Sequence, residues 1–394
     1  MRKVGTIVRG IRTPIIKEGD NLEDIVVKSL LDASKEEGFE FYDKDVVAIT
    51  EAVVGISEGN FATLDDIALD IKNKLHSDHI GIVFPILSRN RFAVCLSAMA
   101  RSTKKITMLL SYPSDEVGND ILYKDDLKKY NVDPFNDVIT YDEYMEKYHS
   151  FLHPFTGVNM VDFYKDLVES EGCECDIVLS NNPLDILRYT NDVINCDIHT
   201  REETKEMLKD DGANVISMTD ILSSSINGSG YNEKYGLLGS NRATEERVKL
   251  FPRTGQKLVE NVQKKLKKET GKNIEVMVYG DGAFKDPVGK IWELADPVVS
   301  PAYTKGLERS PNELKLKYLS ENKFKDLSGE ELNKAIREEI KSKDSNLKGT
   351  MVTQGTTPRR YTDLIGSLCD LTSGSGDKGT PVVLIQRYFS NYSD

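Results

Sequence analysis

Strand-sized apolar segments alternate with helical segments between residues 22 and 218, and this alternation restricts the fold more than any other feature. Strands are expected at 45–50, 80–84, 106–110, 176–179, 193–198 and 214–218, and helices at 22–31, 63–75, 88–101, 184–189 and 200–209. Strands joined through helices run parallel, because each crossover returns the chain to the same edge of the sheet. The pattern predicts an α/β fold of mixed α+β type. No Gly-x-Gly-x-x-Gly follows these strands, so a Rossmann dinucleotide site is not supported.

A chain of 394 residues exceeds the size at which one core usually stops growing, so several parts are expected. Residues 1–112 form an N-terminal α/β part. Residues 113–230 read as an inserted or divergent α/β subdomain, because they begin with an acidic segment rich in Tyr, Phe and Asp that has little periodicity. Residues 231–394 form the C-terminal part. It includes a charged helical insert at 303–348, in which a capping box from Ser328 to Glu331 starts a helix.

Composition excludes several classes of protein. Lys and Arg number 52 against 64 Asp and Glu, and the resulting net charge of −12 argues against non-specific binding to nucleic acid. No apolar segment approaches the roughly 20 residues of a membrane helix, and the N-terminus lacks the pattern of a signal peptide. The five cysteines are odd in number and scattered, as in proteins of a reducing compartment. We therefore expect a cytoplasmic protein that binds neither nucleic acid nor membrane.

The segment 274–279 has the alternation of a half-buried strand, and Gly280-Asp281-Gly282 follows it. Glycines allow a sharp turn and close approach of a ligand, so Asp281 is expected at the tip of the strand. A carboxylate in that place, followed by Lys285 and Asp286, suits a hard divalent cation and a nucleotide phosphate. The alternative is an ordinary Asp-Gly turn with solvated charges.

Two further features bear on anion binding. Arg89 and Arg91 are expected in the first turn of the helix 88–101, where the helix dipole disfavours cations, so they either serve a bound anion or contact water. The glycine loop 373–380 resembles a phosphate loop superficially. It lies between a helix and a strand, whereas a P-loop must follow a strand and open a helix, so we reject that interpretation.

Five segments in order along the chain resemble motifs of the coenzyme F420 gamma-glutamyl ligases. Residues 14–22 resemble P-x-I-x-x-G-D-D-L, and 45–59 resemble D-V-L-V-V-T followed by S-K-A-E-G. Residues 236–241, GLLGSN, are similar to G-V-D-E-S-N, and 278–284, VYGDGAF, to a stretch around S-D-T-F-G. Residues 362–385 resemble A-D-E-L/I through G-I-P-V-V-L-I.

The resemblance implies an F420 ligase-like fold, with mixed sheets and an additional helical insert here, and a homodimer. It implies that GTP, or ATP in its place, and Mg²⁺ or Mn²⁺ activate a carboxylated cofactor as an acyl phosphate, which the amine of L-glutamate attacks. By the same resemblance, the nucleotide pocket includes Lys17, Asp20, Ser57 and Glu58, and Asn241 lies near the metals. Asp281 is the first metal ligand and Asp363 the second.

The chain also departs from the family motifs. Leu238 and Gly239 stand where the family has Asp-Glu, and Leu364 stands where it has an acid after Asp363. Losing these carboxylates removes charge that would hold two cations, unless Asp286, Asp377 or another acid replaces them. Three hypotheses follow: an amide ligase, an enzyme of the same fold with different chemistry and one metal, or a non-catalytic ligand-binding relative.

Overall fold

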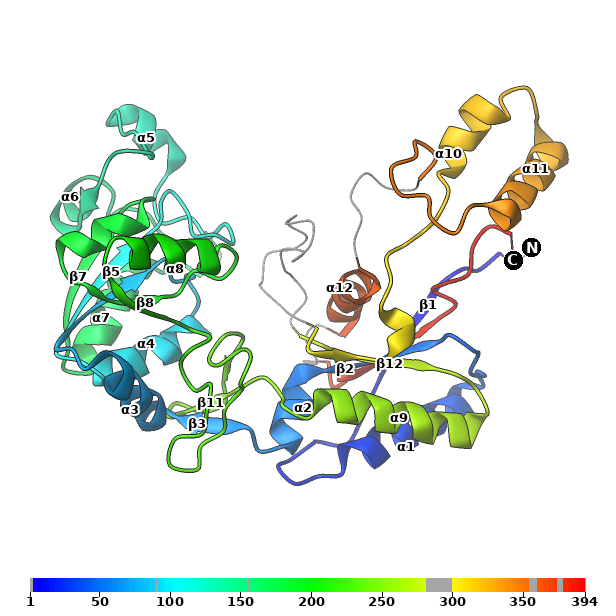
Figure 1. Cartoon of the computed structure of the whole chain (residues 1–394), viewed down its shortest axis with the longest axis horizontal. Coiled ribbons are helices and arrows are strands. Elements are labelled where there is room, and N and C mark those ends of the chain that lie inside the picture. The colour runs from blue at the N-terminus through cyan, green and yellow to red at the C-terminus, as the bar shows by residue number, and fades with distance from the viewer. Residues whose placement is uncertain are drawn as a thin grey trace. The chain divides into compact units, whose positions relative to one another are not determined.

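The computed structural model describes residues 3–89, 91–154, 156–280, 300–353, 360–373 and 378–393. The chain forms two compact units (Figure 1). The first combines Met1–Ser57 with Thr254–Asp394, and the second is the continuous stretch Glu58–Arg253. Within the described ranges, every helix is too short or too polar to cross a lipid bilayer.

The first unit contains a five-stranded mixed sheet with strands from both ends of the chain. Its order is β1 (Ile7–Ile11), β14 (Val382–Gln386), β2 (Val46–Thr50), β12 (Glu275–Tyr279) and β13 (Ala302–Tyr303). Strands β2 and β12 are parallel, whereas the other neighbouring pairs are antiparallel. The strands expected at 45–50 and 274–279 are confirmed to within one residue at each end.

Helices cover both faces of this sheet. Helices α1 (Leu22–Glu37), α2 (Glu51–Ser57) and α9 (Gly255–Thr270) pack on one face, and α12 (Tyr361–Ser373) packs on the other (Figure 1). Side chains alternate between the faces of a strand, so Val276 and Val278 face α9 while Met277 and Tyr279 face α12. The central strands are therefore apolar almost throughout.

The charged insert of the first unit has a small core of its own. It contains the 3₁₀ helix η2 (Lys305–Leu307), α10 (Leu316–Tyr318), the π turn η3 (Leu319–Lys323) and α11 (Gly329–Ser342). Leu319, Ile336 and Ile340 pack together in it. Ser328 is the N-cap of α11, but its side chain makes no capping hydrogen bond, so the predicted capping box is wrong.

The second unit is built on a six-stranded sheet. Its order is β6 (Ile139–Thr140), β7 (Glu174–Leu179), β5 (Lys105–Leu110), β4 (His79–Val83), β8 (Asp192–Asn195) and β9 (Asn214–Ser217). All neighbouring pairs are parallel except β6 with β7. A separate small antiparallel sheet contains β10 (Asn241–Arg242), β11 (Arg247–Lys249) and β3 (Phe61–Thr63). The predicted mixed α/β fold with a parallel sheet is confirmed.

The helices of the second unit lie on both faces of the six-stranded sheet. One core contains α3 (Leu64–Leu75), α4 (Phe92–Arg101) and α7 (Met160–Ser170), and the other contains the 3₁₀ helix η1 (Pro183–Arg188) and α8 (Arg201–Asp210). Short helices α5 (Lys124–Lys129) and α6 (Tyr141–Lys147) lie between β5 and α7 along the chain. The capping box predicted at α3 is confirmed, since the Thr63 hydroxyl accepts from the Asp66 amide and the Asp66 carboxylate accepts from the Thr63 amide.

The compact units differ from the parts that we predicted at 1–112, 113–230 and 231–394. Strands β4 and β5 pair with β8 and β7, so one sheet crosses the boundary at 112. Strand β2 pairs with β12, so the two ends of the chain share the first unit. Hydrogen bonds between distant strands set these units, and composition along the chain does not reveal such pairings.

Helix α4 begins later than predicted. The Ser88 hydroxyl accepts from the Arg91 amide at 3.3 Å, and the first helical residue is Phe92. Arg91 is therefore the N-cap, and Arg89 precedes the helix. The expectation that both arginines lie in the first helical turn is wrong. Their positions therefore no longer indicate an anion bound at the start of α4.

Candidate functional site

The loop after β1 closes on itself and on the end of α2. The Asp20 carboxylate accepts from the Lys17 amide at 2.7 Å, and the Asp20 amide donates to the Lys17 carbonyl at 3.2 Å. Gly19, at a φ of +84°, donates its amide to the Ser57 carbonyl at 3.0 Å. Three predicted nucleotide-pocket residues, Lys17, Asp20 and Ser57, therefore belong to one hydrogen-bonded assembly, with the Lys17 side chain exposed.

The end of β2 places a carboxylate that the sequence interpretation missed. Thr50 is paired with Tyr279 of the parallel strand β12, and its amide donates to the Pro381 carbonyl at 2.9 Å. Glu51 follows directly and opens α2, with only 2% of its surface exposed. The signal available in the sequence was an acid directly after the strand VVAIT, whose first four residues are apolar. Buried carboxylates need compensating partners and are uncommon, so an acid at the end of a buried strand is a candidate functional residue.

Asp363 lies in the first turn of α12 and is buried, with 6% of its surface exposed. One carboxylate oxygen accepts from the Arg360 amide at 3.3 Å and the other from the Thr362 hydroxyl at 3.5 Å. A carboxylate at a helix N-terminus is stabilised by the unpaired amides there. Asp363 is therefore at least a capping residue, and its sheltered carboxylate is of the type that binds hard cations.

The remaining predicted metal residues lie outside the described residues. Asp281, together with the possible substitutes Asp286 and Asp377, falls in segments that the structure does not describe. The pairing of Asp281 with Asp363 therefore stays a prediction. Among the described residues, no three His, Cys, Asp or Glu side chains are grouped so that they could hold a metal ion.

Two predicted site residues belong to the second unit. The Glu58 carboxylate accepts from the Arg253 amide at 2.9 Å, which ties together the two ends of that unit. Asn241 opens β10 and is paired with Lys249 of β11. Lys249 is in turn paired with Phe61 of β3. The predicted site residues are thus divided, with Lys17, Asp20, Ser57 and Asp363 in the first unit and Glu58 and Asn241 in the second.

A family model of the F420-0:gamma-glutamyl ligases matches residues 10–387, which include the whole second unit, most of the first and every predicted site residue. The chain belongs to this family. Membership of a gamma-glutamyl ligase family confirms the resemblance found in the sequence, and it supports an enzyme of the ligase class. No curated protein sequence matches the chain significantly.

In this member of the F420 ligase family, the positions where the motif comparison expects acids are occupied by residues that fit their surroundings. Leu238 is buried in the main core of the second unit. Gly239 has a φ of +74°, and a Cβ atom added there would lie 2.0 Å from the Phe251 ring. No side chain fits at Gly239 unless that ring moves. Leu364, at the third altered position, is half-buried on α12.

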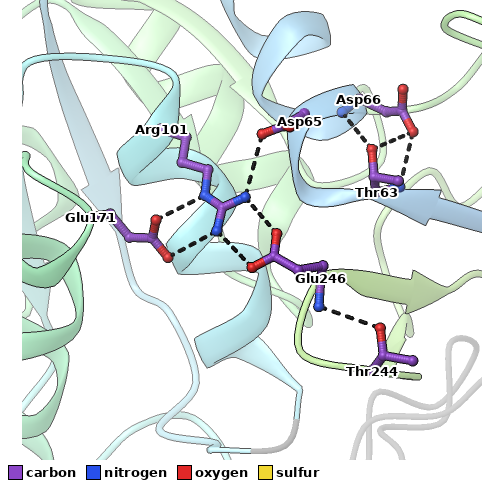
Figure 2. Close-up of polar contacts among 7 residues, drawn as sticks. All are labelled: Thr63, Asp65, Asp66, Arg101, Glu171, Thr244 and Glu246. Carbon is purple, nitrogen blue, oxygen red and sulfur yellow. Dashed lines mark hydrogen bonds and ion pairs between the residues drawn. The ribbon is translucent and has the colours of Figure 1, made fainter.

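In this ligase family member, Arg101 fixes the hairpin that carries Asn241 (Figure 2). At the end of α4, its guanidinium donates to Glu246 at 2.7 and 3.0 Å and to Glu171, the C-cap of α7, at 2.8 Å. It also pairs with Asp65 of α3 at 3.3 Å. Glu246 lies in the turn between β10 and β11. Hydrogen bonds to Glu246 and Glu171 raise the pKa of Arg101 above its already high ordinary value, so the charge is permanent.

We expect Arg101→Met to destabilise the second unit by about 2 kcal/mol, chiefly through loss of the sheltered hydrogen bonds to Glu171. The matched control is Lys104→Met, since both groups of the Lys104–Asp78 pair are well exposed. We expect that change to stay within about 0.5 kcal/mol. Urea unfolding of the two variants measures both effects, and equal midpoints would contradict a structural role for Arg101.

Proposed function

We propose that this protein is a nucleotide- and divalent-metal-dependent amide ligase that adds L-glutamate, or a related amine, to a carboxylated cofactor. A carboxylate oxygen of the cofactor attacks the terminal phosphorus of GTP or ATP, and the nucleoside diphosphate leaves. The amine then attacks the acyl phosphate carbon, inorganic phosphate leaves, and the nitrogen loses a proton. Atoms and charges balance without an oxidant or reductant, and the amide bond is formed at the cost of one phosphoanhydride bond.

Each predicted residue has a role in this proposal. The exposed Lys17 ammonium neutralises phosphate charge, while Asp20 and Ser57 hold the loop around it. For Glu58 and Asn241 the resemblance implies roles in the nucleotide pocket and near the metals. Asp281 and Asp363 would hold Mg²⁺ or Mn²⁺, and the bound ion would stabilise the charge of the transferring phosphoryl group. The family's expected homodimer and a cytoplasmic location are kept as part of the proposal.

One structural observation supports the proposed nucleotide pocket in addition to family membership. The hydrogen bond from Gly19 to Ser57 joins the segment that resembles the family's opening motif to the segment that resembles its second motif. These segments are far apart in the sequence, and the residues that flank the loop, Ile16 and Leu22, pack in the same core as Val54 of α2. We infer that the two segments, held together by this packing and by the Gly19 hydrogen bond, contribute to one nucleotide pocket, as their resemblance to the family motifs implies.

A second candidate is an enzyme of the same fold that uses a single metal. The burial of Leu238 and the position of Phe251 against Gly239 support this alternative, because no carboxylate can occupy either position in this structure. A reduced set of acids would hold less cationic charge. A metal titration that saturates at one equivalent favours this candidate over the two-metal ligase.

We expect calorimetry to detect binding of GTP or ATP, and to find that Mg²⁺ or Mn²⁺ strengthens it. Lys17→Ala should weaken nucleotide affinity about 10-fold, because one phosphate contact to a cation is lost. Lys35→Ala, at an exposed lysine in the last turn of α1, is the matched control and should bind normally. Absence of binding to GTP, GDP and ATP at millimolar concentrations would remove the basis for the ligase proposal.

A further inference from the structure

The small antiparallel sheet of the second unit has two chemically different faces. In β11, Val248 is followed by Lys249, and Leu250 comes directly after the strand. Val248 and Leu250 both pack in the main core of the unit. Side chains alternate between the two faces of a strand, so Lys249 lies on the face that is turned away from this core. Ala62 of β3, which is paired with Val248, belongs to the same core and agrees with this alternation.

The face opposite the core carries a row of three side chains with Lys249 in the middle. Lys249 is paired with Asn241 of β10 on one side and with Phe61 of β3 on the other. Residues directly opposite each other in an antiparallel pair lie on the same face, with their Cβ atoms about 5 Å apart. Asn241, one of the predicted site residues, is therefore an immediate neighbour of Lys249.

Two cations of β11 share this face. Arg247 lies two residues before Lys249, and its guanidinium stacks on the Phe61 ring, 4.5 Å from the ring centroid. None of the residues of β3, β10 and β11 is acidic. The carboxylate of Glu246, which precedes Arg247, accepts hydrogen bonds from Arg101 of α4. The sheet itself therefore contributes only positive charge on this face.

Lys249 is also buried, with 4% of its surface exposed. A lysine is rarely buried to this extent, because removing the ammonium from water is costly unless anionic or polar groups compensate it. Even a compensated buried charge usually stabilises a fold no more than an apolar side chain of similar volume would. The packing of the sheet therefore gives no reason for a cation at this position, which favours a role in binding.

The charge beside Asn241 is opposite in sign to the charge that the family motif implies. Leu238 and Gly239, which stand in place of the motif's two acids, lie shortly before Asn241 and carry no charge. Acids in those positions would attract a cation, whereas the ammonium of Lys249 attracts an anion. The replacement of carboxylates by an ammonium in this part of the unit favours direct contact with a phosphate group.

We propose that Lys249 binds a phosphate group of the nucleotide beside Asn241. This role of Lys249 rests on the proposed nucleotide-dependent function, and it adds a phosphate-binding residue from the second unit. Asn241 is half-buried on the edge strand β10, so the ligand approaches Lys249 across Asn241. The ammonium neutralises phosphate charge where the acids of the motif would have held a metal ion.

Calorimetry with tripolyphosphate and with GTP or ATP tests the role of Lys249. Lys249→Met keeps most of the side chain's length and removes its charge, so the affinity for these ligands should fall about 10-fold or more. Its urea midpoint should stay the same or rise, because an apolar group replaces a buried charge. Arg242→Met is the matched control, since Arg242 is an exposed cation next to Asn241 and is paired with Val248 on the other face. The affinity of this control should stay within about 2-fold of the wild type.

If the wild type binds GTP or ATP and Lys249→Met binds equally well, the role of Lys249 is overturned while the proposed function stands. If the wild type binds tripolyphosphate but neither nucleotide, and Lys249→Met loses that binding, the phosphate site stands and the proposed function fails. Absence of all binding in the wild type contradicts both. If Lys249→Met does not fold, carbon-13 NMR of the wild type replaces it. The Lys249 ε-methylene signal should shift when tripolyphosphate is added, and an unchanged signal overturns the proposed role.

Discussion

Gly239→Ala should destabilise the second unit by about 3 kcal/mol or more. The backbone at Gly239 has a φ of +74°, which strains any residue with a Cβ atom, and that atom would lie 2.0 Å from the Phe251 ring. Phe251 is itself buried and packs against Tyr235, so the ring cannot move outward freely. Chemical denaturation of the variant against the wild type measures the loss.

Gly228→Ala separates the two causes. Gly228 has a similar φ of +83°, but no atom lies within 4 Å of the position that its Cβ would occupy. Its substitution should cost about 1 kcal/mol, which represents backbone strain alone. Equal losses of unfolding free energy in the two variants would show that the Phe251 ring moves aside without cost. Gly239→Glu, which restores the acid of the family motif, should fail for the same steric reason.

Asp281→Asn should lower the affinity for Mg²⁺ or Mn²⁺ by about 10-fold or more while folding changes little, because the substitution keeps size but removes charge. If Asp281 is only a turn residue, asparagine suits the turn equally well and metal binding stays the same. Asp344→Asn, at an exposed acid in the charged insert, is the control for a general loss of negative charge. Metal titration with calorimetric detection measures all three proteins.

Unchanged metal binding in Asp281→Asn would place the metal site elsewhere. Glu51 would then be the next residue to test, since it is buried at the end of β2 beside the end of β12. Asp363→Asn provides a second comparison. It should weaken metal binding if Asp363 is a ligand, and it should lower only the stability of α12 if Asp363 merely caps that helix.

The strands could be predicted where local pattern alone decides. β12 lies where it was predicted, although it is buried on both faces and not half-buried. Helix α9 ends at Gly271, which has a φ of +71°, as the glycine predicted. The beginning of the predicted insert 113–230 shows little apolar periodicity because several of its core residues are tyrosines. Tyr144, Tyr148 and Tyr164 are almost fully buried, and the Tyr164 hydroxyl donates to the Ile86 carbonyl at 2.6 Å. Polar residue types that are buried by such long-range bonds leave no apolar periodicity.

In the candidate site, too, local features could be predicted from the sequence and long-range contacts could not. Lys17, Asp20 and Ser57 could be predicted from short motifs, and their assembly follows from the local turn at Gly19. The loss of the acids at Leu238 and Gly239 was visible in the sequence. The sequence did not show that the Phe251 ring prevents an acid from being restored at Gly239.

The connectivity of the two units also sets an order of events during synthesis of the chain. Strand β2 is made early, but its partners β12 and β14 follow only after the whole second unit. The second unit holds every strand of its main sheet between His79 and Ser217, so it can complete its sheet on the ribosome first. Meanwhile β2, apolar along its length, stays unpaired. The first unit is thus the part of the nascent chain most in need of a chaperone.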